Sequence, residues 1–193
     1  MEEYMFSEKE IVDGCKQGKK KFQDVLYEKY SALLLGVCIR YTKNRMEAED
    51  ILHDAFIKIF ISIKSFELKN EGSLYSWIKR ITVNTALNHL RDNLKHAFTQ
   101  DIDDFSTANQ ISETEEKNSY PDIEPHEILK KINEMPNGYK VVFNMYVIEK
   151  YSHQEIADEL GISLSTSKTQ LFKAKKHLQE ALMKNYKEAK FAI

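Results

Sequence analysis

Helical periodicity runs through almost the whole chain, and it restricts the fold more than any other feature. Apolar residues recur at intervals of three and four along segments 19–42, 46–63 and 73–95, as on one face of an α-helix. No long stretch alternates polar and apolar residues as a half-buried strand does, and only six Gly and three Pro interrupt the 193 residues. The sequence therefore predicts an all-α fold.

Start signals and turns divide this pattern into separate helices. Ser7 with Glu10, and Ser152 with Glu155, have the spacing of a capping box, which satisfies free N–H groups at a helix start. The predicted helices cover residues 8–16, 19–42, 46–63, 73–95, 124–134, 137–148, 152–160 and 163–187.

Charge is distributed unevenly, although the formal net charge is only -2. Residues 101–127 hold four Asp and five Glu against one Lys, with few large apolar side chains to offset the entropy lost on ordering. We therefore expect two small helical domains joined by a flexible acidic linker. Their predicted ranges are residues 8–95, 96–122 and 123–187. The low net charge excludes a uniformly basic nucleic-acid binder, but residues 168–190 form a local basic segment with seven Lys against two Glu.

Other classes of protein find little support in the sequence. No run of 18 apolar residues is present, and the acidic N-terminus lacks the apolar core of a signal peptide, so direct membrane insertion is not expected. Cys15 and Cys38 are isolated, which favours reduced buried thiols in a cytoplasmic protein. The histidines lack metal-ligand spacing, so we expect no metal and no cofactor. His53-Asp54 resembles the HD pair of metal phosphohydrolases, but further His and Asp ligands at suitable spacing are not found.

The segment SHQEIADELGISLSTSKTQLFKAKKHL, residues 152–178, predicts a helix-turn-helix. Gly161 stands where the first helix must reverse, and Gly tolerates the left-handed conformation needed there. On a helical wheel the second helix has an apolar stripe of Leu164, Leu171, Ala174, Leu178 and Leu182. Its opposite face carries Thr166, Thr169, Lys173 and Lys176, flanked by Ser165, Phe172 and Gln170. Hydroxyl and ammonium groups suit phosphates and base edges, whereas the plainer interpretation is a solvated surface helix.

A second polar ridge lies in SLYSWIKRITVNTALNHLRD, residues 73–92. Arg80, Asn84, Asn88 and Arg91 share a narrow arc of the predicted helix, with apolar residues on both sides. Arg and Asn side chains bind phosphates and read bases through forked hydrogen bonds. For the neighbouring Trp77, core packing is the favoured interpretation.

The helix MEAEDILHDAFIKIF, residues 46–60, is apolar on more than one face. Ile51, Leu52, Ala55, Phe56, Ile59 and Phe60 extend around much of its circumference. Such a helix either packs on one side and meets a partner on the other, or is an ordinary buried helix. The pattern leaves both interpretations open.

The chain resembles bacterial sigma factors of the extracytoplasmic-function (ECF) group of the sigma-70 family. The stretches that carry the resemblance are AEDILHDAFIKIF, SWIKRITVNTALNHLR and YVIEKYSHQEIADELGISLSTSKTQLFKAKKHL. Their order and spacing are more specific than any one of them alone. The resemblance implies that domain 8–95 binds core RNA polymerase and the promoter -10 element, and that domain 123–187 reads the -35 element. It also implies no enzymatic activity of the chain's own.

The resemblance also assigns residues and partners by position. The residues that would face the β′ clamp helices of core RNA polymerase are Asp50, His53, Asp54, Phe56 and Phe60. Arg80, Asn84, Asn88 and Arg91 would meet the -10 element, with the loop near 65–73 forming a pocket for a flipped base. Ser165, Thr166, Lys168, Thr169, Gln170, Lys173 and Lys176 would approach the -35 element. Further implied partners are the polymerase β flap, promoter DNA and an anti-sigma factor.

Some positions depart from the family pattern, and two interpretations stay open. Related proteins often have Gln and Glu where this chain has His53 and Asp54, and Arg where it has Gln170. The acidic linker would either lie in the nucleic-acid channel of the polymerase or act as a solvated tether. The alternative function is a stand-alone helix-turn-helix transcriptional regulator, which binds DNA without polymerase, usually as a dimer.

Overall fold

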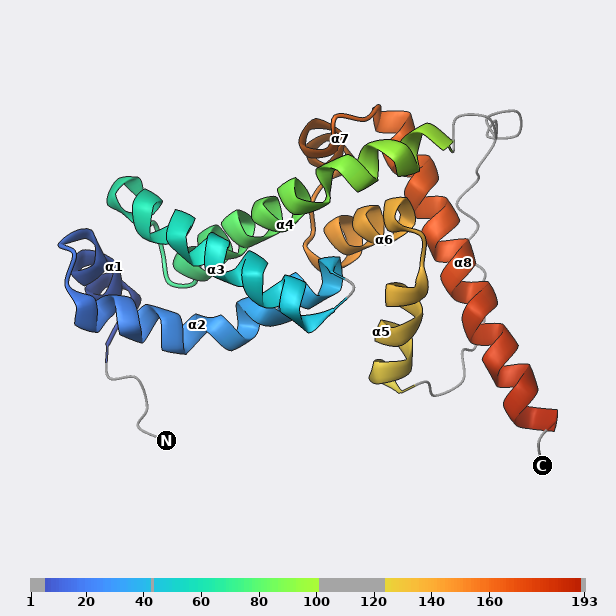
Figure 1. The fold of residues 1–193 in the computed structure, drawn as a ribbon, viewed down its shortest axis with the longest axis horizontal. Helices are drawn as coiled ribbons and strands as arrows, with labels where there is room; N and C mark the ends of the chain where they lie inside the picture. Colours follow the sequence, from blue (N-terminus) through green and yellow to red (C-terminus); the bar gives the residue numbers. More distant parts are fainter. Residues whose placement is uncertain (1–5, 43, 101–123, 192–193) are drawn as a thin grey trace. The chain divides into compact units, whose positions relative to one another are not determined.

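The computed structural model describes residues 6–42, 44–100 and 124–191, and every regular element in these ranges is helical (Figure 1). The prediction of an all-α fold is therefore confirmed. The chain divides into two compact units, residues 1–90 and 91–193. Most of the predicted linker, residues 101–122, lies outside the described residues, whereas residues 96–100 continue a helix that we expected to end at residue 95.

The helices of the N-terminal part are α1 (Glu8–Lys16), α2 (Lys20–Tyr41), α3 (Arg45–Ser62), the short η1 (Ile63–Ser65) and α4 (Ser73–Gln100). Those of the C-terminal part are α5 (Pro125–Glu134), α6 (Asn137–Phe143), the π-helix η3 (Asn144–Ile148), α7 (His153–Leu160) and α8 (Leu164–Phe191). Within the described ranges no helix is long and apolar enough to cross a membrane.

Capping hydrogen bonds determine where α1 and α3 begin. The capping box of α1 is present, with the Glu10 N–H donating to Ser7 Oγ at 3.3 Å and the Ser7 N–H donating to Glu10 Oε2 at 2.8 Å. At the start of α3, Asn44 Oδ1 accepts from the Glu47 N–H at 2.9 Å. Helices α1 and α3 both pack against α2, and the buried core takes side chains from all four long helices, including Ile11, Leu26, Ile59 and Ile78.

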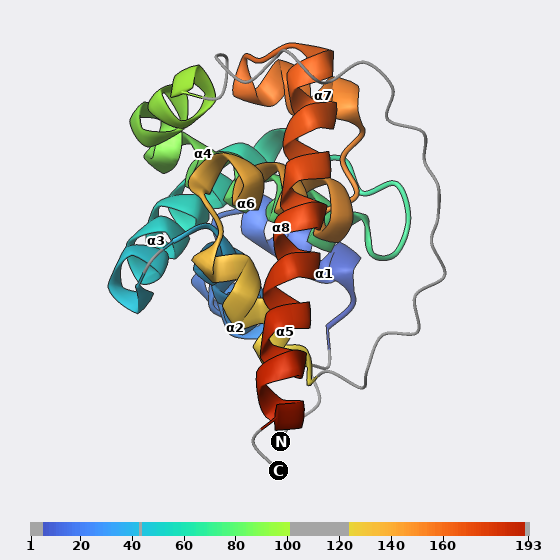
Figure 2. The same ribbon diagram turned by 90° about the vertical axis from the view of Figure 1, so that its right-hand side faces the viewer.

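The C-terminal unit is built around α8, which contacts α5, α6 and α7 (Figure 2). Ser152 and Glu155 form the predicted capping box of α7, and Gly161 adopts the left-handed conformation at φ 65°. Ser163 Oγ then accepts from the Thr166 N–H at 3.0 Å at the start of α8. The predicted helix-turn-helix is therefore confirmed in its geometry.

The helix expected over residues 137–148 changes type part-way. After Phe143 the chain forms a π-helix, in which the Glu149 N–H donates to the carbonyl of Asn144 at 2.9 Å. One extra residue is held in such a turn, and this places both Asn144 and Met145 in the core. Apolar periodicity over so few residues does not distinguish a π-turn from an α-turn.

Candidate functional site

Helix α3 exposes a face on which large apolar side chains surround polar ones. Met46, Ile57 and Ile61 are 74%, 47% and 70% exposed. Asp50 and His53 are also exposed and lie between them on the same side of the helix. We call Met46, Asp50, His53, Ile57 and Ile61 the α3 face. Large apolar side chains exposed together on one side of a helix, with polar ones among them, are typical of a surface that meets a partner.

The other side of α3 lies in the core, and it includes one residue that we expected at the partner surface. Phe56 is only 3% exposed, and its ring centroid lies 4.6 Å from that of Tyr27 and 5.8 Å from that of Phe60. The expectation that Phe56 faces a partner directly is therefore wrong, because its side chain points toward α2. Phe60 is partly exposed at the edge of the core.

Asp54 is tied to the neighbouring helix. Its Oδ2 lies 3.0 Å from Nε2 of His89 on α4, and both side chains are about half exposed. The contact joins α3 to α4 within the same unit. Asp54 is thus partly accessible, and its carboxylate already has a partner within the protein.

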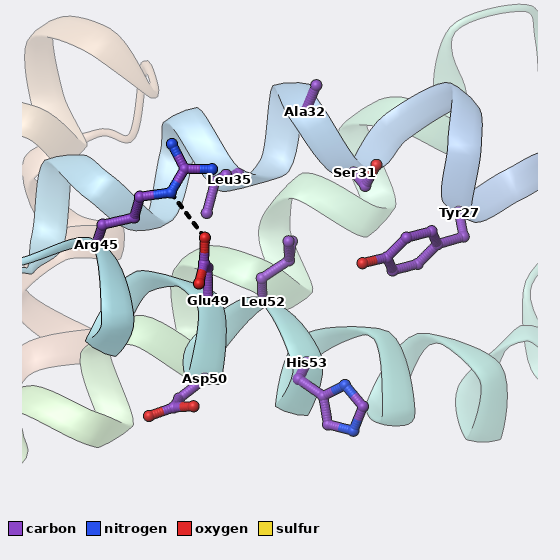
Figure 3. A pocket seen from close by; sticks show the side chains of 9 residues that line it. All are labelled: Tyr27, Ser31, Ala32, Leu35, Arg45, Glu49, Asp50, Leu52 and His53. Atoms are coloured by element: carbon purple, nitrogen blue, oxygen red, sulfur yellow. Dashed lines mark hydrogen bonds and ion pairs between the residues drawn. The ribbon is translucent and has the colours of Figure 1, made fainter.

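An open groove of about 600 Å³ runs between α2 and α3 beside the α3 face (Figure 3). It is lined by Tyr27, Ser31, Ala32 and Leu35 from α2 and by Arg45, Glu49, Asp50, Leu52 and His53 from α3. Arg45 Nε pairs with Glu49 Oε1 at 2.7 Å at one end, and the Tyr27 side chain lies at the other. Asp50 and His53 belong to both the groove and the α3 face, so one partner surface can engage both.

The structure shows part of the polar ridge that the sequence predicts on α4. Arg80 and Asn88 are exposed, and Asn84 between them is half-buried. Arg91 belongs to α4, but its side chain lies outside the described residues. Trp77 stacks on Phe66 with ring centroids 4.5 Å apart, which supports the packing role expected for it.

Helix α8 presents the exposed face that the sequence predicts, with an aromatic ring at its centre. Ser165, Lys168 and Lys176 are exposed, while Thr166, Thr169 and Lys173 are half-buried beside them. Phe172 is 44% exposed and occupies the middle of the exposed arc. We call Ser165, Lys168, Thr169, Phe172 and Lys176 the α8 face.

Gln170 is not part of this surface. It is 1% exposed, so the expectation that it flanks the exposed face is wrong. The buried side of α8 is centred on Ser167 and Ala174, and Leu164, which the sequence placed in the packed stripe, is exposed at the helix start. Because two of the buried residues, Ser167 and Gln170, are polar, an apolar stripe alone misplaces the packed side.

A histidine contact joins the two helices of the helix-turn-helix, and no pattern in the sequence indicates it. Nδ1 of His153 on α7 lies 2.9 Å from Oγ of the fully buried Ser167 on α8. The imidazole stacks on Tyr146 with ring centroids 4.4 Å apart. Burial first, and then the charges of Lys168 and Lys175, lower the pKa of His153 below its ordinary value of 6.5.

This lowered pKa predicts a loss of stability in acid. The fold favours neutral His153, so its contribution to stability is complete above pH 6.5 and declines as the pH falls through the folded-state pKa. We expect His153→Gln to reduce the loss of melting temperature between about pH 8 and about pH 5.5. The measurement is thermal unfolding of both proteins at both pH values, and an identical pH dependence would contradict the assignment.

Comparison with known proteins agrees with these features. Residues 26–95 match the family model of sigma-70 region 2, and residues 126–178 match that of sigma-70 region 4. RNA polymerase sigma factor SigV of Bacillus subtilis is 31% identical over 144 residues, covering 75% of this chain and 81% of that protein. The chain belongs to the sigma-70 family. The resemblance to sigma-70 factors that the sequence motifs indicated is therefore confirmed.

Other relatives extend the similarity across nearly the whole sigma factor. RNA polymerase sigma-H factor of Pseudomonas aeruginosa is 25% identical over 193 residues, covering 94% of this chain and 97% of that protein. The ECF sigma factor SigW of Bacillus subtilis is 26% identical over 190 residues, covering 89% and 96%. In the solved structure of sigma factor RpoE with anti-sigma factor NepR from Bartonella quintana, the matching chain is 22% identical with a TM-score of 0.50. That match covers 86% of this chain and 98% of the other.

These comparisons favour an ECF sigma factor over a stand-alone helix-turn-helix regulator, because both sigma regions are present in the expected order. The family consists of transcription initiation factors. Within the described ranges, no three His, Cys, Asp or Glu side chains gather as a metal site would require.

Proposed function

We propose that this sigma factor docks on core RNA polymerase through the α3 face and presents α4 and α8 to the promoter. The observation that carries the proposal is the exposure of Met46, Ile57 and Ile61 around Asp50 and His53. Burying these apolar side chains against the β′ clamp helices would supply binding free energy, and Asp50 would add charge complementarity. A stand-alone regulator has no need of such a surface outside its helix-turn-helix.

The α8 face is suited to the -35 element. Lys168 and Lys176 would neutralise phosphates, and the hydroxyl groups of Ser165 and Thr169 would hydrogen-bond to phosphates or base edges. Phe172, at the centre of the face, would make apolar contact with a thymine methyl group in the major groove. Half-buried Thr166 and Lys173 would contact DNA at the edge of the α8 face, and buried Gln170 would support α8 from the core.

The -10 element would be met by α4 and by the loop before it. Arg80 and Asn88 are exposed and Asn84 lies between them, so the ridge can follow one strand of opened DNA. The loop at residues 66–72 would hold a base extruded from the stack, which costs a few kcal/mol of unstacking. We keep Arg91 as a contact with the same element because of its position in the sequence motif.

In this function the chain makes and breaks no covalent bond. Core polymerase performs nucleotidyl transfer in the cytoplasm, and the sigma factor supplies binding free energy and fixes the register of the promoter. We assign residues 8–95 to the -10 and clamp contacts, and residues 123–187 to the -35 element and the β flap. RpoE of Bartonella quintana was solved with an anti-sigma factor, and we propose a partner of that class here.

Phosphate contacts by α8 predict a change in salt dependence. Replacing both Lys168 and Lys176 with Ala should weaken binding of the holoenzyme to a -35 duplex and reduce the slope of log K against log salt by about 1.8. The matched control is Lys130→Ala with Lys150→Ala, two exposed lysines of the same unit that lie outside α8. A slope unchanged by the α8 variant would show that these lysines do not neutralise phosphates.

The experiment that tests the proposed function measures promoter opening and binding to core polymerase separately. We expect Arg80→Ala with Asn88→Ala to lower promoter opening by core polymerase, because exposed contacts to the opened strand are lost. Affinity for core polymerase should be unchanged. Opening is measured by permanganate reactivity of unpaired thymines, and docking by fluorescence titration without DNA. Equal loss of both, or loss of neither, would contradict the assignment of the ridge.

A further inference from the structure

The loop that leads into α4 is attached to α1 by a single carboxylate. Glu8 Oε2 accepts a hydrogen bond from the backbone N–H of Gly72 at 3.0 Å, across 64 residues of sequence. Glu8 Oε1 accepts from the hydroxyl of Tyr30 on α2 at 3.2 Å. One side chain therefore connects α1, α2 and the last residue before α4.

Tyr30 makes this junction rigid. Its side chain is buried, and its ring stacks on that of Tyr75 in the first turn of α4, with centroids 6.0 Å apart. Burial, followed by the charge and the hydrogen bond of Glu8, raises the pKa of the Tyr30 phenol far above its ordinary value. The phenol therefore stays protonated and remains a hydrogen-bond donor to Glu8.

The loop at residues 66–72 is thus held at both ends. Phe66 is buried against Trp77 at one end, and Gly72 is bound by Glu8 at the other. Gly72 has φ 83°, a left-handed conformation that glycine adopts without steric cost, and in this conformation its N–H points to the Glu8 carboxylate. Between these points Glu67, Lys69, Asn70 and Glu71 are exposed and available to a ligand.

We propose that Glu8 is a positioning residue for promoter opening, which holds loop 66–72 in the form that receives an unpaired -10 base. This inference rests on the proposed function of the loop. A loop that is already ordered loses less conformational entropy when it binds, and so binds more tightly. Helix α1 then has a role in DNA opening through the loop that Glu8 holds.

The test uses holoenzyme assembled from core polymerase and the full chain, with a single-stranded -10 oligonucleotide as the probe. Glu8→Ala should weaken oligonucleotide binding about tenfold, the effect of losing a hydrogen bond to a charged group. Tyr30→Phe keeps the stacked ring and the Gly72 contact, so it should weaken binding less. Affinity for core polymerase and for a -35 duplex should stay at the wild-type level in both.

Glu10→Ala is the matched control. Glu10 lies in the same turn of α1 and carries the same charge, but among the described residues its side chain hydrogen-bonds with Ser7 and not with the loop. It should lower the melting temperature through the lost capping box and leave oligonucleotide binding unchanged. A loss with Glu10→Ala equal to that with Glu8→Ala would overturn the proposal, since the effect would then be general destabilisation.

Amide hydrogen exchange in the free protein adds a readout that does not depend on DNA. In Glu8→Ala the Gly72 amide should exchange faster, whereas in Glu10→Ala it should exchange at the wild-type rate. Wild-type binding of the oligonucleotide by Glu8→Ala would overturn the positioning role alone. If wild-type holoenzyme failed to prefer the -10 sequence over a scrambled one, the proposed function of the loop would fail, and this inference with it.

Discussion

We expect the double variant Ile57→Glu, Ile61→Glu to lose at least about 100-fold in affinity for core RNA polymerase while remaining folded. Both side chains are exposed in the free protein, so carboxylates at these positions are solvated and cost little stability. In the complex the same carboxylates would be buried against an apolar partner surface without compensation. Fluorescence titration of labelled protein with core polymerase measures the affinity, and circular dichroism measures the melting temperature.

Leu33→Glu is the matched control for this variant. Leu33 is an exposed apolar residue of the same unit, but it lies on α2 and outside the α3 face. The same substitution there should leave polymerase binding nearly unchanged. If it cost as much as the double variant, or if the double variant bound at the wild-type level, the α3 face would not be the docking surface.

Phe56→Ala should act on stability, with a loss of about 3–5 kcal/mol in the free energy of unfolding. Its ring is buried against Tyr27 and Phe60, so truncation removes apolar contacts and leaves a cavity between α2 and α3. Urea unfolding monitored by circular dichroism measures the change. Any loss of polymerase binding should follow the loss of folded protein.

Asp50→Ala should behave in the opposite way. Asp50 is exposed on the α3 face, so its removal should weaken polymerase binding and leave the free energy of unfolding nearly unchanged.

A Phe56→Ala protein of wild-type stability that failed to bind polymerase would restore Phe56 as a contact residue. It would also contradict the packing of Phe56 against Tyr27 and Phe60.

The helices and most of their starts were predictable because their determinants are local. Ser7, Asn44 and Ser152 cap helices through side chains within three residues, and Gly161 reverses the chain through its own backbone. Each of these signals lies within a few consecutive residues. The π-turn after Phe143 has no comparable signal, because it depends on how the core accommodates one additional residue.

Burial was harder to predict, since it depends on which side of a helix meets its neighbours. Phe56 resembles a contact residue by its position in the motif, but the packing of α2 on α3 turns it inward. Ser167 and Gln170 are polar and yet buried, so a search for apolar stripes misses them. The exposed Ile57 and Ile61 could have been found by centring the helical wheel on Asp50 and His53.

Contacts between distant residues were beyond the reach of the sequence. Glu8 meets Gly72 across 64 residues, and His89 meets Asp54 across 35. No local pattern indicates either pair, because each depends on the packing of whole helices. The positioning role of α1 therefore follows only from the three-dimensional structure.

The most direct test of the account is a comparison of two affinities of the unmodified protein. One is its affinity for core RNA polymerase in the absence of DNA, and the other is its affinity for promoter-length duplex DNA in the absence of polymerase. A sigma factor with net charge -2 should bind the polymerase stoichiometrically and free DNA weakly. Tight binding to DNA alone, with no binding to core polymerase, would contradict the central claim.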